Sequence, residues 1–291
     1  MVATSARPTP RSILLAVGSA RGDERAVERA FQLTKQWNAS LTILHVVDSS
    51  AGGQNLTTDE IRDLMSREFA EHPQSKGFHS DLQVARGDPV EQLLIKLKQL
   101  NSDMIVMGVG HHDNLQKKLL GSTIDRVIRA AAVPVLSVRL QAFATYESLL
   151  VLTDFSPPSQ RALDTAIALN SWSIATVLHV CDAMPTVMAE DKLEALKAEL
   201  SGKLTDTVHQ AMNARRGGTE MNESKIVKKL KFGVPIDVIE HYVADRQPHL
   251  VVVGTHGRTG FLRAVLGSVA ERLLRILPCD VLVVGSPEKT Q

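Results

Sequence analysis

The chain of 291 residues has the composition of a globular protein, with 44% apolar and 22% charged residues. Its 33 basic and 32 acidic residues give a formal net charge of +1, which argues against a broad electrostatic surface for nucleic acid or anionic membranes. No apolar run approaches the roughly 20 residues of a membrane span. The opening residues, MVATSARPTPRS, contain no apolar core of signal-peptide length, and two cysteines make no disulfide framework. We therefore expect a reduced cytoplasmic protein without a membrane span.

Short apolar runs that are typical of buried strands recur through the first half of the chain. In chain order they are SILLAV at 12–17, LTILHVVD at 41–48, IVMG at 105–108 and VPVLSV at 133–138. A turn, Gly87-Asp88-Pro89-Val90, lies between the second and third of these runs.

The second half alternates strand patterns with helical patterns more completely. Strands are expected at 148–153, 175–180, 225–232, 250–254 and 280–285. Helices are expected between them, at 161–172, 190–216, 235–246 and 269–277. Five strands with intervening helices predict an α/β fold with a parallel sheet covered on both faces.

The two halves are copies of one unit. The segment 105–122, IVMGVGHHDNLQKKLLGS, aligns without a gap with 251–268, VVVGTHGRTGFLRAVLGS, at an offset of 146 residues. The first two apolar runs of each half also correspond. The repeat predicts two tandem domains, each a five-stranded parallel-sheet α/β domain of common size. Their expected limits are residues 11–140 and 147–286.

Three features of the second half are expected at one edge of the sheet. Asp154 follows its first strand, Val180 ends its second strand, and Gly254 ends its fourth strand. In open parallel sheets, ligands bind outside the carboxyl ends of the strands, where the winding reverses. An acid, an apolar slot and a glycine loop suit a ribose, a base and a phosphate chain respectively.

The glycine loop of the second half predicts a phosphate cradle. Gly254 and Gly257 allow positive φ and a close approach of the backbone to a ligand. Gly267-Ser268 opens a helix whose unpaired N–H groups favour an anion. There is no GxxxxGK[ST], which excludes a P-loop, and GTHGRTG is not the GxGxxG of dinucleotide-binding folds.

These motifs resemble the universal stress protein family in its tandem-domain form, over roughly residues 11–139 and 147–285. The spacing G-x2-G-x9-G-[ST] is similar to that family's nucleotide loop, and TDFS at 153–156 is similar to its first-strand signature. The resemblance implies a five-stranded parallel α/β fold in each half. It also implies binding of ATP or a related adenine nucleotide, with or without Mg²⁺, in the half with the complete loop.

Carried over to the second half, the resemblance implies a nucleotide site. Asp154 and Thr153 would hold the nucleoside, and Val180 would pair with adenine through its backbone. The loop residues would hold the ribose and the phosphates. The complete set is Thr153, Asp154, Val180, Val253, Gly254, Thr255, His256, Gly257, Gly267, Ser268 and Val269. Ala270 lies where some members have a hydroxyl residue.

The first half departs from this pattern in two places. Gly18 stands where the second half has its acid, and His111 replaces the second loop glycine. A non-glycine residue in the left-handed conformation costs roughly 1–2 kcal/mol, and the His111 side chain would occupy phosphate space. We predict that the first half does not bind ATP in the usual way. Its Gly121-Ser122 helix start would suit at most a smaller anion.

Several other side chains have simpler structural interpretations. No third ligand accompanies His111-His112-Asp113, so a metal site there is disfavoured. His45 and His179 are equivalent positions and are predicted to be packed for structural reasons. Cys181 is predicted to be a small buried apolar residue.

Three functions remain open at this point. The leading hypothesis is a stress-response protein that binds nucleotide in its second domain and acts as a sensor or adaptor, without strong catalysis and with no catalytic residue assigned. One alternative is a slow ATP hydrolase or adenylyl-transfer enzyme. The other is a scaffold that binds a lipid-like or small anionic ligand. The expected partners are the nucleotide and further copies, with the two halves packed as an intramolecular pseudo-dimer and a homodimer as a further expectation.

Overall fold

The computed structural model describes residues 9–18, 22–48, 56–72, 80–109, 123–142, 145–169, 172–183, 185–214, 223–255 and 266–285. These residues fall into two compact units. The N-terminal unit is Pro10–Thr145, and the C-terminal unit is Tyr146–Ser286 together with Thr9.

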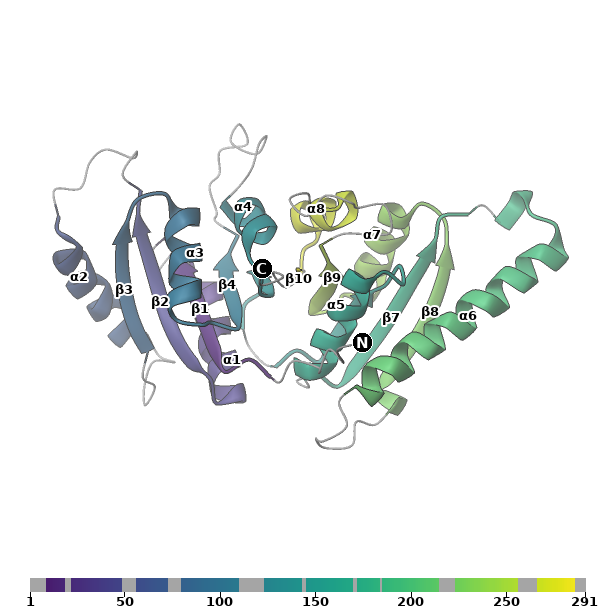
Figure 1. Ribbon diagram of the computed structural model, residues 1–291, viewed down its shortest axis with the longest axis horizontal. Coiled ribbons are helices and arrows are strands. Elements are labelled where there is room, and N and C mark those ends of the chain that lie inside the picture. Colours follow the sequence, from purple (N-terminus) through teal and green to yellow (C-terminus); the bar gives the residue numbers. More distant parts are fainter. Residues whose placement is uncertain are drawn as a thin grey trace, which may run out of the picture. The chain divides into compact units, whose positions relative to one another are not determined.

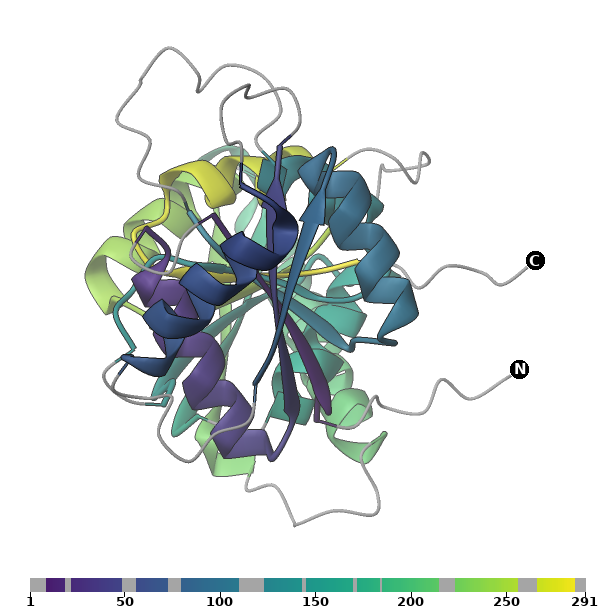
Figure 2. The same cartoon turned by 90° about the vertical axis from the view of Figure 1, so that its left-hand side faces the viewer.

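The described part of the N-terminal unit has five parallel strands in the order β3-β2-β1-β4-β5. They are β1 (Ser12–Val17), β2 (Ser40–Val47), β3 (Ser80–Arg86), β4 (Met104–Gly108) and β5 (Val135–Val138). Its helices are α1 (Glu24–Trp37), α2 (Thr58–Ala70), α3 (Pro89–Gln99) and α4 (Thr123–Ala130). In Figures 1 and 2, α1 and α2 lie on one face of these strands, and α3 lies on the other.

The described part of the C-terminal unit repeats this order of strands as β10-β9-β6-β7-β8, again all parallel. The strands are β6 (Ser148–Leu152), β7 (Ile174–Cys181), β8 (Ile226–Phe232), β9 (Leu250–Gly254) and β10 (Asp280–Val284). The helices are α5 (Pro157–Leu169), α6 (Glu190–Asn213), α7 (Pro235–Arg246) and α8 (Ser268–Ile276), with short 3₁₀ turns η4 (Pro185–Val187) and η5 (Glu223–Lys225). Helix α5 packs beside α6, and α7 packs beside α8. The predicted fold class is confirmed.

Burial explains the composition of the strands. The inner strand β9 is the apolar run LVVVG, and all five of its residues are buried, because helices cover both of its faces. The edge strand β8 instead reads IVKKLKF and is largely exposed or half-buried. Lysines on an edge strand keep it soluble and discourage pairing with other chains.

The two units share a glycine with the same backbone conformation at matching positions. Gly87 follows β3 with φ of +132°, and Gly233 follows β8 with φ of +129°. The Gly87 N–H donates to the Val47 carbonyl at 3.1 Å, and the Gly233 N–H donates to the Cys181 carbonyl at 3.0 Å. An L residue rarely adopts this conformation, so each turn into the following helix requires glycine.

The winding reverses at one place in each sheet. In the C-terminal unit the reversal lies between β6 and β9, and in the N-terminal unit it lies between β1 and β4. The carboxyl ends of these paired strands form the edge where a ligand is expected. Among the described residues, no helix is both long and apolar enough to cross a membrane.

Candidate functional site

The loop from β6 to α5 carries Asp154, the acid expected at the edge of the sheet. Its carboxylate accepts hydrogen bonds from the Ser156 backbone N–H at 3.0 Å and from the Ser156 hydroxyl at 2.5 Å. This is an Asx turn, which leads into a helix. Helix α5 then begins at Pro157. Proline suits the first position of a helix because it has no backbone N–H, and a backbone N–H there would have no partner within the helix.

Buried hydroxyl groups fix the shape of this loop. The Thr153 hydroxyl lies 3.2 Å from the Ser159 hydroxyl and accepts from the Phe155 backbone N–H at 3.1 Å. The Ser159 hydroxyl also donates to the Ser156 carbonyl at 3.0 Å. All three residues are buried: the exposed fractions are 6% for Thr153, 5% for Ser156 and 4% for Ser159. Ser156 was noted only as part of TDFS and Ser159 was not predicted, although an Asp-x-Ser pattern before two prolines is a signal for this turn.

These contacts set the charge of the acid. Burial of Asp154 opposes its ionisation, but hydrogen bonds from Ser156 and Ser159 outweigh that effect and lower the pKa of Asp154 below its ordinary value of 3.8. Asp154 is therefore an ionised acceptor at neutral pH.

Phe155 is held in an unusual backbone conformation between Asp154 and Ser156. Its φ is +64°, in the left-handed region that a non-glycine residue adopts at a cost. The ring packs against the His179 ring at 4.2 Å between centroids, and the Lys203 Nζ atom lies 5.0 Å from the Phe155 centroid. These contacts from β7 and α6 hold the loop at the edge of the sheet.

Gly254 has a packing role that the sequence did not predict. A Cβ atom at Gly254 would lie 2.7 Å from the Pro158 carbonyl carbon and 2.9 Å from the Ser159 nitrogen. The structure shows no positive φ at Gly254. The glycine is therefore required because the start of α5 packs against the end of β9, and this contact places the loop of Asp154 beside the end of β9.

The two arms of the glycine loop meet at Thr255 and Gly267. The Gly267 N–H donates to the Thr255 carbonyl at 2.6 Å, and the Thr255 N–H donates to the Val284 carbonyl at 3.1 Å. Gly267 is the N-cap of α8, without a side-chain cap, and Ser268 is the first helical residue. The first N–H groups of α8 therefore lie next to the end of β9, and the N-cap residue itself offers them no side-chain hydrogen bond.

The remaining predicted site residues lie on the same elements. Val180 is half-buried near the end of β7, opposite Lys231 of β8. Val253 is 7% exposed within β9, and Val269 is half-buried in the first turn of α8. His256 and Gly257 lie outside the described residues.

The two equivalent histidines make matching hydrogen bonds. His179 donates from Nδ1 to the Thr153 carbonyl at 2.8 Å, and His45 donates from Nδ1 to the Val17 carbonyl at 3.1 Å. Each therefore ties the second strand of its unit to the end of the first strand. This geometry agrees with the predicted structural role.

The corresponding edge of the N-terminal unit contains a carboxylate that the sequence pattern did not predict. Asp23 accepts a hydrogen bond from the Gly18 N–H at 2.6 Å, and its Oδ1 atom is 2.5 Å from where a Gly108 Cβ would be. Asp23 and Ser159 occupy matching positions, 136 residues apart. An acid thus takes the place of a hydroxyl between the ends of β1 and β4. His111, Gly121 and Ser122 lie outside the described residues.

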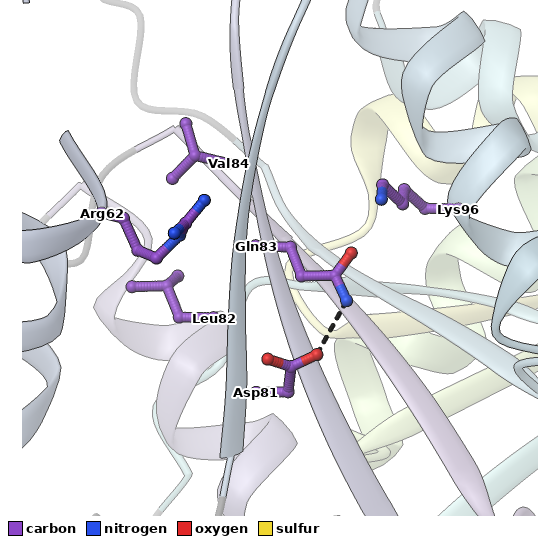
Figure 3. Close-up of a pocket in the computed structure, with 6 residues that line it drawn as sticks. All are labelled: Arg62, Asp81, Leu82, Gln83, Val84 and Lys96. Atoms are coloured by element: carbon purple, nitrogen blue, oxygen red, sulfur yellow. Dashed lines mark hydrogen bonds between the residues drawn. The ribbon is translucent and has the colours of Figure 1, made fainter. Parts of the chain in front are cut away.

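The N-terminal unit also has an open recess of about 380 Å³ along its edge strand β3. Figure 3 shows its lining side chains, which come from β3, α2 and α3. They are Arg62, Asp81, Leu82, Gln83, Val84 and Lys96. None of the residues predicted for the nucleotide site lines this recess.

The fold and the site together define the class of protein. Each unit is a parallel α/β domain, and the C-terminal unit brings an acid, a glycine-ended strand and an uncapped helix start to the point where the winding reverses. A model of the Universal stress protein family matches residues 10–139 and 145–285. The chain therefore belongs to the universal stress protein family, with two such domains in tandem.

Known proteins agree with this assignment. Universal stress protein E of Salmonella typhi is 24% identical over 302 residues, which cover 96% of this chain and 95% of that protein. A universal stress protein of Methanocaldococcus jannaschii is 33% identical over 148 residues, covering 50% of this chain and 85% of that protein. A solved universal stress protein structure from Pseudomonas aeruginosa shares the fold, with a TM-score of 0.68, 18% identity and coverage of 95% of this chain and 93% of that chain.

Proposed function

We propose that the C-terminal unit binds one adenine nucleotide, ATP or a related compound, and that this binding serves a stress-response function. The observation that carries the proposal is the junction of α5, β9 and α8. The backbone contact at Gly254 and the 2.6 Å hydrogen bond from Gly267 to Thr255 bring Asp154 and the start of α8 to one edge.

The chemistry of this edge suits a nucleotide. The ionised Asp154 carboxylate would accept hydrogen bonds from the ribose hydroxyls. The end of β7 at Val180 would offer backbone groups to adenine. The N–H groups at the start of α8, beginning at Ser268, would bind phosphate, because a helix N-terminus carries a partial positive charge. Mg²⁺ would be held mainly by the phosphates and would offset part of their negative charge.

The N-terminal unit is proposed not to bind ATP in this way. Its Asp23 carboxylate lies against both Gly18 and Gly108, at the ends of β1 and β4. A negative charge at that position repels a phosphate. The charge of Asp23 adds to the two departures seen in the sequence, Gly18 in place of the acid and His111 in place of the second loop glycine.

Nucleotide binding would act through conformation and not through strong catalysis. The site loop includes a residue with positive φ, Phe155, whose position depends on contacts from β7 and α6. A bound nucleotide would select one arrangement of these elements and so alter what the protein contacts, including further copies of itself. We propose that this activity lies in the cytoplasm, where thiols such as those of Cys181 and Cys279, neither of which is in a disulfide, stay reduced.

Calorimetric titration of the full chain with ATP and Mg²⁺ tests the proposal. Hydrogen bonds to charged groups contribute about 1.5–3 kcal/mol, so Asp154→Ala should raise the Kd about 10- to 150-fold. Asp245→Ala is the matched control, because Asp245 is an exposed acid near the end of α7, at the opposite edge of the sheet. Equal affinity of the Asp154→Ala protein and the unaltered protein would refute the site.

A turnover assay separates binding from the enzymatic alternative. Phosphate release from ATP at a steady rate, abolished by Asp154→Ala and unaffected by Asp245→Ala, would favour the hydrolase. The proposal predicts release no faster than in the Asp154→Ala protein.

A further inference from the structure

A histidine and two glutamates meet on the outer surface of the N-terminal unit, in a cluster separate from the proposed nucleotide site. Glu24 and Glu28 lie one turn apart on α1, and His72 follows α2. One oxygen of each carboxylate and one ring nitrogen of His72 all lie within 4.8 Å of one another. We propose that Glu24, Glu28 and His72 form a binding site for a divalent transition-metal ion, with Zn²⁺ as the representative ion.

The histidine is held in place for this role. Its ring stacks on Phe31, with 5.7 Å between centroids and 24° between planes. Phe31 is 3% exposed and lies on α1 one turn beyond Glu28. The His72 backbone N–H donates to the Phe69 carbonyl at 3.1 Å. The stack on Phe31 positions the imidazole and the backbone hydrogen bond fixes the residue that carries it, so an ion would find one ligand already oriented.

The two carboxylates supply the charge. Glutamates four residues apart on a helix repel one another and destabilise the helix. A divalent cation between Glu24 and Glu28 neutralises both charges and replaces repulsion with attraction to a shared centre. Glu24 is exposed, and Glu28 and His72 are half-buried, so water can complete the coordination.

The set of donor atoms selects the type of ion. An imidazole nitrogen with two carboxylate oxygens suits Zn²⁺ and its neighbours in the transition series, whereas Ca²⁺ and Mg²⁺ prefer oxygen ligands alone. Ligand atoms on a tetrahedral Zn²⁺ are about 3.4 Å apart, given bonds of about 2.1 Å. The three ligand atoms now lie within 4.8 Å of one another. Rotation of the glutamate side chains, which are exposed or half-buried, would bring these atoms to the shorter distance.

A second contact between a histidine and a carboxylate in the described residues lacks these properties. His209 lies 3.1 Å from a Glu223 oxygen, but the Lys228 Nζ atom lies 3.1 Å from the same oxygen. A lysine ammonium already provides the positive charge there, and no second carboxylate joins the cluster. This pair therefore serves as a control.

Calorimetric titration of the chelator-treated full chain with Zn²⁺ alone tests the site. One Zn²⁺ per chain is expected, and Ca²⁺ should give no comparable binding. Loss of a ligand should weaken Zn²⁺ binding at least about tenfold in Glu24→Gln, Glu28→Gln and His72→Gln. Glu223→Gln and a double variant, His111→Gln with His112→Gln, should bind as the unaltered protein does.

Two results would overturn the proposal. One is the absence of saturable Zn²⁺ binding, which would leave the cluster as an ion-pair group only. The other is unchanged binding in Glu24→Gln, whose exposed side chain can be altered without disturbing the fold. Circular dichroism without metal checks that His72→Gln is folded, and ATP binding should be unchanged in all three variants.

Discussion

Replacing Gly254 by alanine tests whether the contact between α5 and β9 builds the site. The new Cβ atom would lie 2.7 Å from the Pro158 carbonyl carbon, 2.8 Å from the Pro158 oxygen and 2.9 Å from the Ser159 nitrogen. Carbon atoms in contact are normally about 3.5–4.0 Å apart. The start of α5 would therefore have to move by almost 1 Å. All three obstructing atoms belong to the backbone, so side-chain rotation cannot relieve the clash.

The expected cost follows from this geometry. Overpacking a well-packed interior costs about 1–3 kcal/mol, so Gly254→Ala should lower the free energy of unfolding of the C-terminal unit by that amount. The shift of α5 would also move the Asp154 loop, because Ser159 bonds to Thr153. We therefore expect ATP binding to weaken in the same variant.

Urea unfolding followed by tryptophan fluorescence measures the loss. The sequence has two tryptophans, Trp37 in the N-terminal unit and Trp172 in the C-terminal unit. In a Trp37→Phe background, Trp172 reports on the C-terminal unit alone. Trp172 is 7% exposed, and its Nε1–H donates to the Ala166 carbonyl at 2.9 Å.

Gly202→Ala is the matched control for this experiment. A Cβ atom at Gly202 meets nothing within 4 Å, and the residue lies inside α6. That substitution should stabilise the unit by about 0.5–1 kcal/mol. The reasoning fails if Gly254→Ala and Gly202→Ala shift the urea midpoint in the same direction, or if Gly254→Ala leaves it unchanged.

Three further measurements address buried and charged groups of the C-terminal unit. Tyr146→Phe removes a 2.6 Å hydrogen bond to the fully buried Asp280. It should lower the free energy of unfolding in urea by about 1–3 kcal/mol. An unchanged free energy of unfolding would contradict this prediction. Burial raises the pKa of Asp164, although Gln160 and Arg161 oppose the shift. The folded state therefore disfavours the ionised form of Asp164, so Asp164→Asn should stabilise the protein at pH 7. This gain in the free energy of unfolding should become smaller as the pH falls and should vanish below the ordinary pKa of 3.8. A gain that persists at about pH 3 would argue against burial as its cause. Because the pKa of Asp154 is lowered, binding of uncharged adenosine should be constant between about pH 5 and pH 8, and a loss of affinity on acidification within that range would contradict the assignment.

Much of the fold could be predicted because the sequence contains two copies of the same domain. The alternation of apolar runs with helical patterns defined the strands, and the repeat aligned matching turns such as Gly87 and Gly233. Strands with both faces buried, such as β9, carry an unbroken apolar signal. Local patterns of this kind depend on neighbouring residues, so they can be read without a structure.

The missed features depend on contacts between distant segments. The sequence predicted a positive φ at Gly254, which the structure does not show, and it did not predict the contact of this glycine with the backbone atoms of Pro158 and Ser159. Asp23 stands at the start of α1, where acids are common as caps, yet its carboxylate lies against Gly108 at the end of β4. Neither partner can be identified from spacing, because the fold brings it into contact.

The nucleotide content of the purified protein tests the central claim most directly. Freshly purified full chain is heat-denatured, and the released adenine nucleotide is identified by chromatography and quantified per chain, with the Asp154→Ala protein in parallel. The account predicts about one adenine nucleotide per chain in the unaltered protein and almost none in the Asp154→Ala protein. Two per chain would contradict the assignment of a single site to the C-terminal unit. No nucleotide, with no binding when ATP and Mg²⁺ are added, would contradict nucleotide binding itself.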